Sequence, residues 1–194
     1  MSEDFNTYIN HINPDFWRDL CVSEGQLRHY KRGEEFLRIG EVSKYIGYIK
    51  SGTLKYVAFS AAGKEHVVGL EFEGEFVVDF PQCLYDSPSI VSIIAVSPCD
   101  IYCFPTKEVA RRMQTDLKLK DVVMHSTEAL FSTVYTRYLS MYCKTPQERF
   151  DELVEKHPDM FAIFPLKDIA SYLNITPTHL SRLRRNVKKA AWNS

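Results

Sequence analysis

The sequence has few of the features that mark a membrane, secreted or metal-binding protein. No apolar run approaches the ~20 residues that a membrane-spanning helix needs. The acidic start of the chain lacks the basic and then apolar pattern of a secretion signal. The five cysteines are odd in number and include no C-x-x-C pair, which leaves no zinc or iron–sulfur motif and favours reduced, mostly buried thiols. We therefore expect a cytoplasmic protein with no membrane partner, no bound metal and no cofactor.

Charge of one sign is missing from two stretches of the chain. No Lys or Arg occurs between Glu65 and Ile101, and no Asp or Glu occurs from Ile169 to Ser194. The net charge is −1, so any contact with a nucleic acid has to come from a local basic patch. The acid-free C-terminal stretch is such a patch. Its basic residues are Arg182, Arg184, Arg185, Lys188 and Lys189.

The N-terminal half shows the pattern of short β-strands. Apolar residues make up 45% of the 194 residues, which is enough for a packed core. After two short helices, runs rich in Val, Ile, Tyr and Phe follow one another closely and are separated by glycine or turn residues. The runs cover residues 27–30, 35–38, 44–50, 53–59, 64–71, 76–80, 89–96 and 100–104. Eight short strands at this spacing predict an antiparallel jelly roll or small barrel.

A long helix is predicted after the strands. A short helix over 106–114 leads into one over 117–142, which is about 39 Å long at 1.5 Å per residue. The long helix carries two apolar stripes, so the barrel can cover one and a partner helix the other. The stripe that we assign to the seam of a homodimer is Leu119, Val123, Ser126, Leu130, Thr133 and Arg137. The second stripe is Phe131, Val134, Tyr135, Tyr138 and Tyr142. The alternative is a single amphipathic helix that lies on the barrel.

Residues 165–185 predict two helices joined by a tight turn. Asn174 occupies the turn, because Asn tolerates a positive φ better than most residues. Thr176 can cap the second helix, and Pro177 suits its first position, where no N–H is needed. The residues predicted to face inward are Leu166, Ile169, Ala170, Leu173, Ile175, Leu180 and Leu183. This is the layout of a DNA-binding helix-turn-helix, with an ordinary pair of packed helices as the alternative.

The order of these parts resembles the Crp/Fnr family of transcription regulators (cyclic AMP receptor protein and FNR). The resemblance covers nearly the whole chain and includes the glycine-containing patterns KRGEEFLRIGE at 31–41 and IGYIKSGTLK at 46–55. It implies an α+β fold: a double-stranded β-helix (jelly roll) of the cyclic nucleotide-binding type, a long dimerisation helix and a C-terminal, winged-helix-like helix-turn-helix domain. The corresponding domains are residues 1–116, 117–143 and 144–194. The implied partners are double-stranded DNA, a second copy of the chain and RNA polymerase.

The phosphate-binding segment of that family is altered here. Gly74, Glu75 and Phe76 lie where the segment begins, and the spacing to the next strand places Ser89 and Ile90 where the family has Arg followed by Ser or Thr. A cyclic nucleotide phosphate needs a cation beside it, and this stretch supplies none. We therefore expect no response to cyclic AMP. The pocket is either vestigial or holds a different, less anionic small-molecule effector.

The resemblance also assigns roles on the second helix of the helix-turn-helix. The residues expected to contact DNA are Thr176, Pro177, Thr178, His179, Ser181, Arg182, Arg185 and Lys188. Arg182 matches a family arginine that contacts guanine, and the bidentate Arg–guanine pair is the commonest specific contact. His179, Arg185 and Lys188 are assigned to phosphates.

Two other functions remain open. A metal-dependent, cupin-like enzyme on the same barrel needs two or three histidines and a carboxylate around one metal, but His66 has no H-x-H partner. We therefore expect a protein that is not an enzyme. A ligand-sensing module whose helix-turn-helix binds another protein is the second alternative, and the acid-free tail argues against it. His29, His66 and Cys99 are candidates for a haem ligand, and each is interpreted as an ordinary strand residue.

Overall fold

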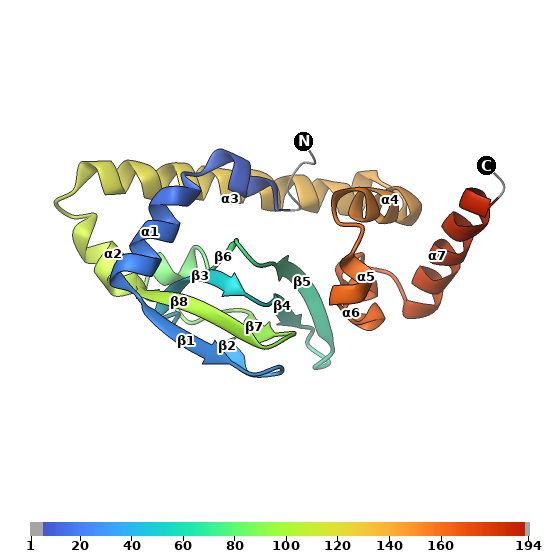
Figure 1. The fold of residues 1–194 in the computed structure, drawn as a ribbon, viewed down its shortest axis with the longest axis horizontal. Helices are drawn as coiled ribbons and strands as arrows, with labels where there is room; N and C mark the ends of the chain where they lie inside the picture. The colour runs from blue at the N-terminus through green and yellow to red at the C-terminus, as the bar shows by residue number, and fades with distance from the viewer. Residues whose placement is uncertain (1–5, 193–194) are drawn as a thin grey trace.

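The N-terminal part of the chain is a jelly roll of two packed sheets. The structure is a computed structural model that describes the backbone of residues 6–192 and the side chains of residues 6–186. The strands are β1 (Gln26–Tyr30), β2 (Glu35–Leu37), β3 (Tyr45–Ser51), β4 (Leu54–Phe59), β5 (Glu65–Glu71), β6 (Phe76–Val77), β7 (Ser92–Ala95) and β8 (Cys99–Pro105). They form two antiparallel sheets in the orders β1-β8-β3-β6 and β2-β7-β4-β5. The predicted jelly roll is confirmed (Figure 1).

The space between the two sheets is filled by apolar side chains that alternate along the strands. Its fully buried members include Ile49, Leu54, Val77, Ile93 and Ile101. Burial of this kind stabilises the fold by about 25 cal/mol per Å² of apolar surface removed from water.

Two strands are shorter than the sequence predicts, because side chains and turns take their backbone hydrogen bonds. β6 ends at Val77 instead of residue 80, since the Tyr56 hydroxyl accepts from the N–H of Val78 (3.1 Å) and donates to its carbonyl (3.0 Å). β7 begins at Ser92 instead of residue 89, since the backbone of Ser89 bonds to the 40–41 turn, at 2.8 Å in each direction. The chain between these strands contains the short 3₁₀ helix η2 (Gln82–Leu84).

Helices that precede and follow the strands in the sequence cover one side of the barrel. The 3₁₀ helix η1 (Thr7–His11) and helix α1 (Pro14–Glu24) precede the strands, and α2 (Thr106–Arg112) follows them. The long helix α3 (Leu117–Cys143) then runs along the barrel beside η1 (Figure 1). It starts where the Asp116 carboxylate accepts hydrogen bonds from two backbone N–H groups, at 2.9 and 3.1 Å. In the described part of the chain, no helix is both long and apolar enough to cross a membrane.

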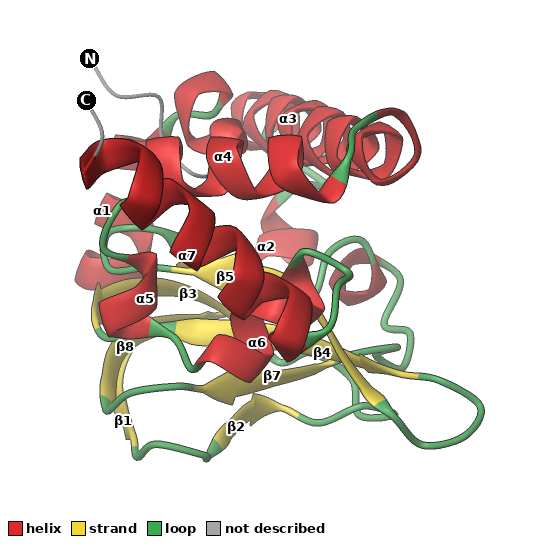
Figure 2. Cartoon of the chain, turned by 90° about the vertical axis from the view of Figure 1, so that its right-hand side faces the viewer, coloured by secondary structure: helices red, strands yellow, loops and turns green. Residues whose placement is uncertain are grey.

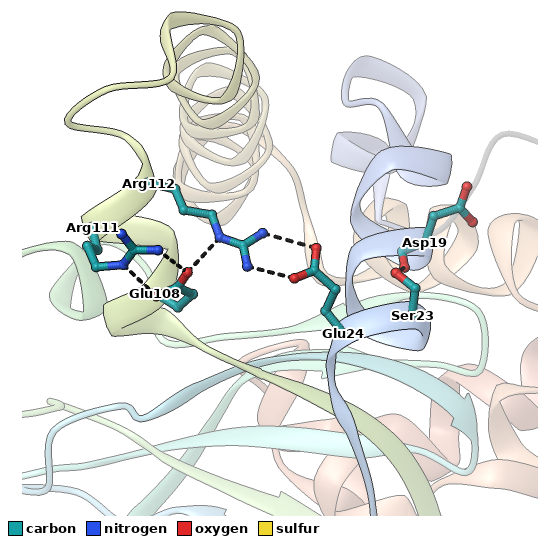
Figure 3. Close-up of polar contacts among 6 residues, drawn as sticks. All are labelled: Asp19, Ser23, Glu24, Glu108, Arg111 and Arg112. Carbon is teal, nitrogen blue, oxygen red and sulfur yellow. Dashed lines mark hydrogen bonds and ion pairs between the residues drawn. The ribbon is translucent and has the colours of Figure 1, made fainter.

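An arginine on α2 joins the two helices that flank the barrel. The Arg112 guanidinium donates to both carboxylate oxygens of Glu24 on α1, at 2.6 and 3.0 Å, and to Glu108 at 2.7 Å (Figure 3). Arg111 donates to the same Glu108 carboxylate, at 2.7 and 2.8 Å. These hydrogen bonds hold the pKa of Glu108 down, at about 2. The cluster is partly exposed, so it contributes orientation more than stability.

The C-terminal part is a small helical unit that packs on the barrel. Its helices are α4 (Pro146–Lys156), α5 (Met160–Ile163), α6 (Leu166–Tyr172) and α7 (Pro177–Trp192). Figure 2 shows α6 in front of the β4–β5 side of the barrel and α7 outside it. One apolar core contains Val67, Leu70, Phe72 and Val96 from the barrel part together with the inner side chains of α4, α6 and α7. The C-terminal unit and the barrel therefore share a core.

Polar contacts fix α6 on the sheet. The Ser171 hydroxyl accepts a hydrogen bond from the backbone N–H of Val67 on the edge strand β5, at 2.9 Å. The ammonium of Lys55 on β4 lies 2.9 Å from the carboxylate of Asp168 on α6, and both side chains are about nine-tenths buried (11% and 8% exposed). Such a pair is buried only where the surrounding groups hold it in place, so the position of α6 is well defined.

Candidate functional site

The turn between α6 and α7 has the geometry that the sequence predicts. Asn174 has φ +54°, and the N–H of Ile175 donates to the carbonyl of Ala170 at 2.9 Å. Ala170 is fully buried where the two helices meet. The Thr176 hydroxyl accepts from the N–H of His179 at 3.2 Å and so caps α7. The helix–turn–helix arrangement is confirmed.

The two faces of α7 differ as expected. Leu180 and Leu183 are buried in the shared core, while the predicted DNA-contacting residues lie on the other side. Those exposed to solvent are Thr176, Pro177, Thr178, Ser181, Arg182 and Arg185, and His179 is half-buried. The Ser181 hydroxyl donates to the carbonyl of Pro177 at 3.0 Å. The side chain of Lys188 lies outside the described residues.

One residue near this surface differs from the sequence interpretation, and one basic residue packs against a neighbouring helix. Leu166 is 39% exposed although the spacing assigns it to the buried face, because it is the first residue of α6 and extends past the core. Arg184 belongs to the basic patch, but its guanidinium lies 4.3 Å from the centre of the Phe161 ring. The outer face of α7 is therefore formed around Arg182 and Arg185, with Arg184 packed toward α5.

The predicted dimer seam on α3 is covered by the chain itself. Leu119, Val123 and Ser126 are buried, and the Ser126 hydroxyl accepts from the indole N–H of Trp17 on α1 at 2.9 Å. The other members of the seam are half-buried: Leu130 packs in the same cluster, Thr133 lies 3.0 Å from the hydroxyl of Thr7, and Arg137 reaches the barrel. This corrects the sequence interpretation, since η1 and α1 occupy the face that was assigned to a partner.

The opposite face of α3 is exposed and apolar. Leu117, Met124, Phe131 and Tyr138 follow one another at intervals of seven residues and are 75%, 50%, 68% and 56% exposed. Val134, Tyr135 and Tyr142 add to the same face. Phe131 stacks on Tyr135, and Tyr138 lies against Tyr142, with ring centres 5.8 and 5.0 Å apart. A seven-residue repeat is the spacing at which two helices pack along their length.

A cavity of about 850 Å³ lies between the barrel, η1, α3 and the C-terminal helices. Of the five predicted effector-pocket residues, Phe76 and Ile90 line it. Gly74, Glu75 and Ser89 are not part of its wall: Gly74 has φ +85° in a tight turn, and Ser89 is buried with its hydroxyl on the carbonyl of Val91 at 2.7 Å. Two of the five predicted residues therefore line this cavity, and three do not.

Two carboxyl groups are buried together beside the cavity. The side-chain N–H₂ of Asn6 lies 3.1 Å from Glu71 Oε2 and 2.8 Å from Glu75 Oε2, which also accepts from the N–H of Phe72 at 2.8 Å. The Tyr8 hydroxyl is 3.2 Å from Glu71. Burial first, and then the nearby Glu75 carboxylate, raises the pKa of Glu71 well above its usual value. Glu71 therefore holds a proton at pH values where an exposed glutamate is ionised.

Asp79 is another buried acid, and it lies in the cavity wall. Its side chain is 5% exposed, and Oδ2 has no hydrogen-bond partner among the described residues. Burial raises the pKa of Asp79, and a hydrogen bond with Ser89 partly offsets this. Sequence reasoning missed Asp79, although an acid inside the apolar run 76–80 is a signal for a site.

Arg137 on α3 connects the cavity wall to α6. Its guanidinium donates to the carbonyls of Val68 (2.6 Å) and Tyr172 (3.0 Å), and it lies 3.5 Å from the centre of the Tyr172 ring. Burial lowers the pKa of Arg137, and the Tyr172 ring opposes this. The residue was assigned to a dimer seam, but it joins barrel, long helix and helix-turn-helix within one chain.

The candidate haem ligands serve as strand residues. His29 Nδ1 lies 2.6 Å from the Asp100 carboxylate, and the buried Cys99 thiol lies 3.4 Å and 3.2 Å from the carbonyls of Thr53 and Ser97. His66 pairs with Ala58 in the β4–β5 ladder. Across residues 6–186, His, Cys, Asp and Glu side chains form no group of three or more that could hold a metal ion.

Comparison with known proteins places these parts in a known architecture. Residues 27–116 match the family model of the cyclic nucleotide-binding domain. Comparison with the sequences of curated proteins finds no match. Solved structures with this fold include FixK2 from Bradyrhizobium japonicum, with 15% identity, a TM-score of 0.75 and 86% of each chain covered.

Two further solved structures match over a larger part of the chain. A protein assigned to the Crp/Fnr family from Eubacterium rectale has 18% identity and a TM-score of 0.69, with 94% of this chain and 86% of the other covered. The c-di-GMP-responsive global regulator CLP from Xanthomonas campestris has 13% identity and a TM-score of 0.67, with 92% and 93% covered. The chain is therefore an α+β protein in which a cyclic nucleotide-binding-type domain is followed by a long helix and a C-terminal helical region, as in Crp/Fnr structures.

Proposed function

We propose that this chain is a transcription regulator of the Crp/Fnr type that binds double-stranded DNA as a homodimer. The observation that carries the proposal is the outer face of α7, where Arg182 and Arg185 are exposed on a helix whose inner face is buried. No acid follows residue 168 to oppose phosphate binding. In this proposal residues 1–116 are the effector domain, 117–143 link and dimerise, 144–194 read DNA, and RNA polymerase is the further partner. The protein acts by binding and not as an enzyme.

On DNA, the roles follow from chemistry and position. Arg182 donates two hydrogen bonds to guanine in the major groove, with Pro177, Thr178 and Ser181 beside it. Arg185, His179 and Lys188 contact phosphates, which sets the register without reading sequence. Pro177 has no N–H and the N–H of His179 is used by the Thr176 cap, so the N–H of Thr178 is the one near the start of α7 that remains for a phosphate.

The dimer forms through the exposed face of α3. Support comes from the seven-residue repeat of Leu117, Met124, Phe131 and Tyr138, which is apolar, exposed and extends along most of the helix. A two-fold axis along this helix places two copies of α7 on the same side of the assembly, as a palindromic site requires.

Cyclic AMP is not the effector in this proposal. Asp79, which follows β6, lies in the cavity wall. The stretch from residue 65 to residue 101, which includes it, contains no Lys or Arg. A phosphate bound beside Asp79 would face a buried carboxyl group, and this region supplies no Lys or Arg to compensate, which is costly at low dielectric.

Selection of bound duplexes from a random DNA library tests the proposal. At moderate salt and without ligand, we expect a palindrome whose half-sites are about 34 Å apart, one helical turn. Arg38→Ala serves as a control for removal of an arginine from α7, since Arg38 is an exposed arginine on the barrel, on the turn after β2. Recovery of only salt-sensitive, unspecific binding, with and without a screen of small molecules, would contradict the proposal.

A further inference from the structure

The cavity has the size and lining of a site for a small organic molecule. Its volume of about 850 Å³ lies within the range of drug-sized ligand pockets. Most of its wall is apolar, with Ile12, Trp17, Ile46, Leu84, Val123 and Leu130 among the lining residues. A molecule that fills it therefore needs an apolar body. A few polar groups in the wall then decide which polar end the molecule carries.

One polar atom in this wall is left for a ligand. Asp79 is one of the residues that line the cavity, and its buried Oδ2 has no hydrogen-bond partner among the described side chains and backbone groups. A buried carboxylate oxygen without a donor costs free energy unless a bound group supplies one. A ligand with a hydrogen-bond donor at this end of the cavity would satisfy the Asp79 carboxylate.

The charges around the cavity favour a cationic donor over a neutral one. Asp79 lies in the wall, and no Lys or Arg occurs in the sequence between Glu65 and Ile101. The wall also contains four basic residues, from α3, from the segment after it and from α4, and each already has a partner. Arg137 and Arg149 donate to backbone carbonyls, and Lys144 pairs with Glu152. A cation near Asp79 therefore has an unpartnered oxygen to bind.

We propose that this cavity binds an amphipathic organic amine, with an aromatic or aliphatic body against the apolar wall and a protonated nitrogen that donates to Asp79 Oδ2. A charge-assisted hydrogen bond of this kind is about twice as strong as one between neutral groups. The cavity is also lined by Tyr172 and Leu173 at the end of α6, so an occupant contacts the helix-turn-helix as well as the barrel. The regulatory meaning of this site rests on the proposed function, but the binding itself does not.

Three probes with one body and different end groups test the proposal. They are 4-phenylbutylamine, 4-phenyl-1-butanol and 4-phenylbutyrate, and binding to the full chain is measured by calorimetry without DNA. We expect the amine to bind at least about tenfold more tightly than the alcohol, from the strength of hydrogen bonds to charged groups, and the carboxylate to bind weakest. The same affinity for amine and alcohol, or no binding of the amine, would overturn the proposal.

Two substitutions in one segment separate the site from general charge effects. Asp79→Asn keeps the shape of the side chain and removes its charge, so the preference for the amine over the alcohol should disappear while the alcohol binds within about twofold. Asp86→Asn makes the same charge change at an exposed residue outside this cavity, with φ +51°, which Asn tolerates. This control should keep the preference.

The other possible results also test the role of Asp79 and the class of ligand. An amine preference that survives in Asp79→Asn would refute the role of Asp79. The ranking of the three probes on the unaltered protein tests the ligand class even where the variant does not fold. DNA selection is measured separately, so a protein that binds the amine but no DNA would refute the proposed function and leave this inference standing.

Discussion

The pair Glu71 and Glu75 shows how a single buried residue carries a measurable pH dependence. Asn6 donates to both carboxyl groups, and the pKa of Glu71 is raised because burial and a neighbouring carboxylate disfavour its charged form. A group whose pKa is higher in the folded state binds a proton more tightly there. Its contribution to stability is therefore complete below the unfolded-state pKa of about 4.3 and is lost as the pH rises through the folded-state pKa.

The variant Glu71→Gln should remove this dependence. Gln keeps an oxygen that can accept from Asn6 and Tyr8, but it has no proton to lose. We expect the two proteins to have similar unfolding free energies at pH 4 and the variant to be more stable by about 1 kcal/mol or more at pH 8, since one pKa unit corresponds to about 1.4 kcal/mol. Urea unfolding between pH 4 and pH 8 measures this. A difference that is the same at every pH would show that Glu71 does not titrate in this range.

On α7, two arginines should give different results when they are removed. Arg182→Ala should relax the base preference at one position and cost about 1–3 kcal/mol on the preferred sequence, because a bidentate base contact is lost. Arg185→Ala should weaken all sequences alike and lower the slope of log K against log salt by about 1. Titrations of a selected and a scrambled duplex at several salt concentrations distinguish the two. Equal effects of both changes on every duplex would contradict these roles.

At the residue scale, the sequence was sufficient to predict turns and helix caps, whose geometry depends on neighbouring residues. Asn174, Thr176 and Pro177 were predicted from the sequence, because turn and cap preferences depend on neighbouring backbone atoms. Asp79 and Glu71 were missed as cavity residues, because their environment comes from η1 and α3, far away in the sequence.

Among the elements, α3 carries the surface that we propose for the dimer. Its apolar repeat is exposed on the side that faces away from η1 and α1. The sequence predicted the helix and both of its apolar stripes. It did not predict which stripe the barrel covers, since that depends on where the first helices pack and not on the periodicity of α3.

A single charge on that face should separate the dimer. Phe131→Glu places a carboxylate in the middle of the proposed seam, and we expect the dissociation constant to rise at least about tenfold, because an interface centre tolerates an unpaired charge poorly. Ser132→Glu is the control, because the next residue is also exposed but points about 100° away around the helix. Sedimentation equilibrium measures the dissociation constant. Dissociation by both changes, or by neither, would place the interface elsewhere.

For the whole molecule, the Lys55–Asp168 pair decides how firmly the helix-turn-helix is held on the barrel. The two residues are 113 positions apart and both are nearly buried. The order of the parts could be predicted from the sequence, because each part has its own pattern. The contact between them could not, because a Lys on one strand and an Asp on a later helix give no joint signal.

Breaking this pair on one side should destabilise the protein strongly. Asp168→Ala leaves the Lys55 ammonium buried without its partner, which typically costs about 3–5 kcal/mol. The double variant Lys55→Met with Asp168→Leu should recover most of the loss, because an apolar pair replaces a charged one. Chemical unfolding of both variants measures the difference. A loss below about 0.5 kcal/mol in Asp168→Ala would indicate that the pair is open to water.

The shared core between the sheet and the C-terminal helices has a consequence for how such proteins diversify. Val67, Leu70, Phe72 and Val96 are covered by side chains of the C-terminal helices. A C-terminal helical unit grafted from a relative would leave these four side chains exposed unless its own side chains matched their shape. Under the proposed function, new DNA specificity should therefore arise by substitution on the outer face of α7. Exchange of whole C-terminal domains should be disfavoured, because the two halves are coupled through one set of packed side chains.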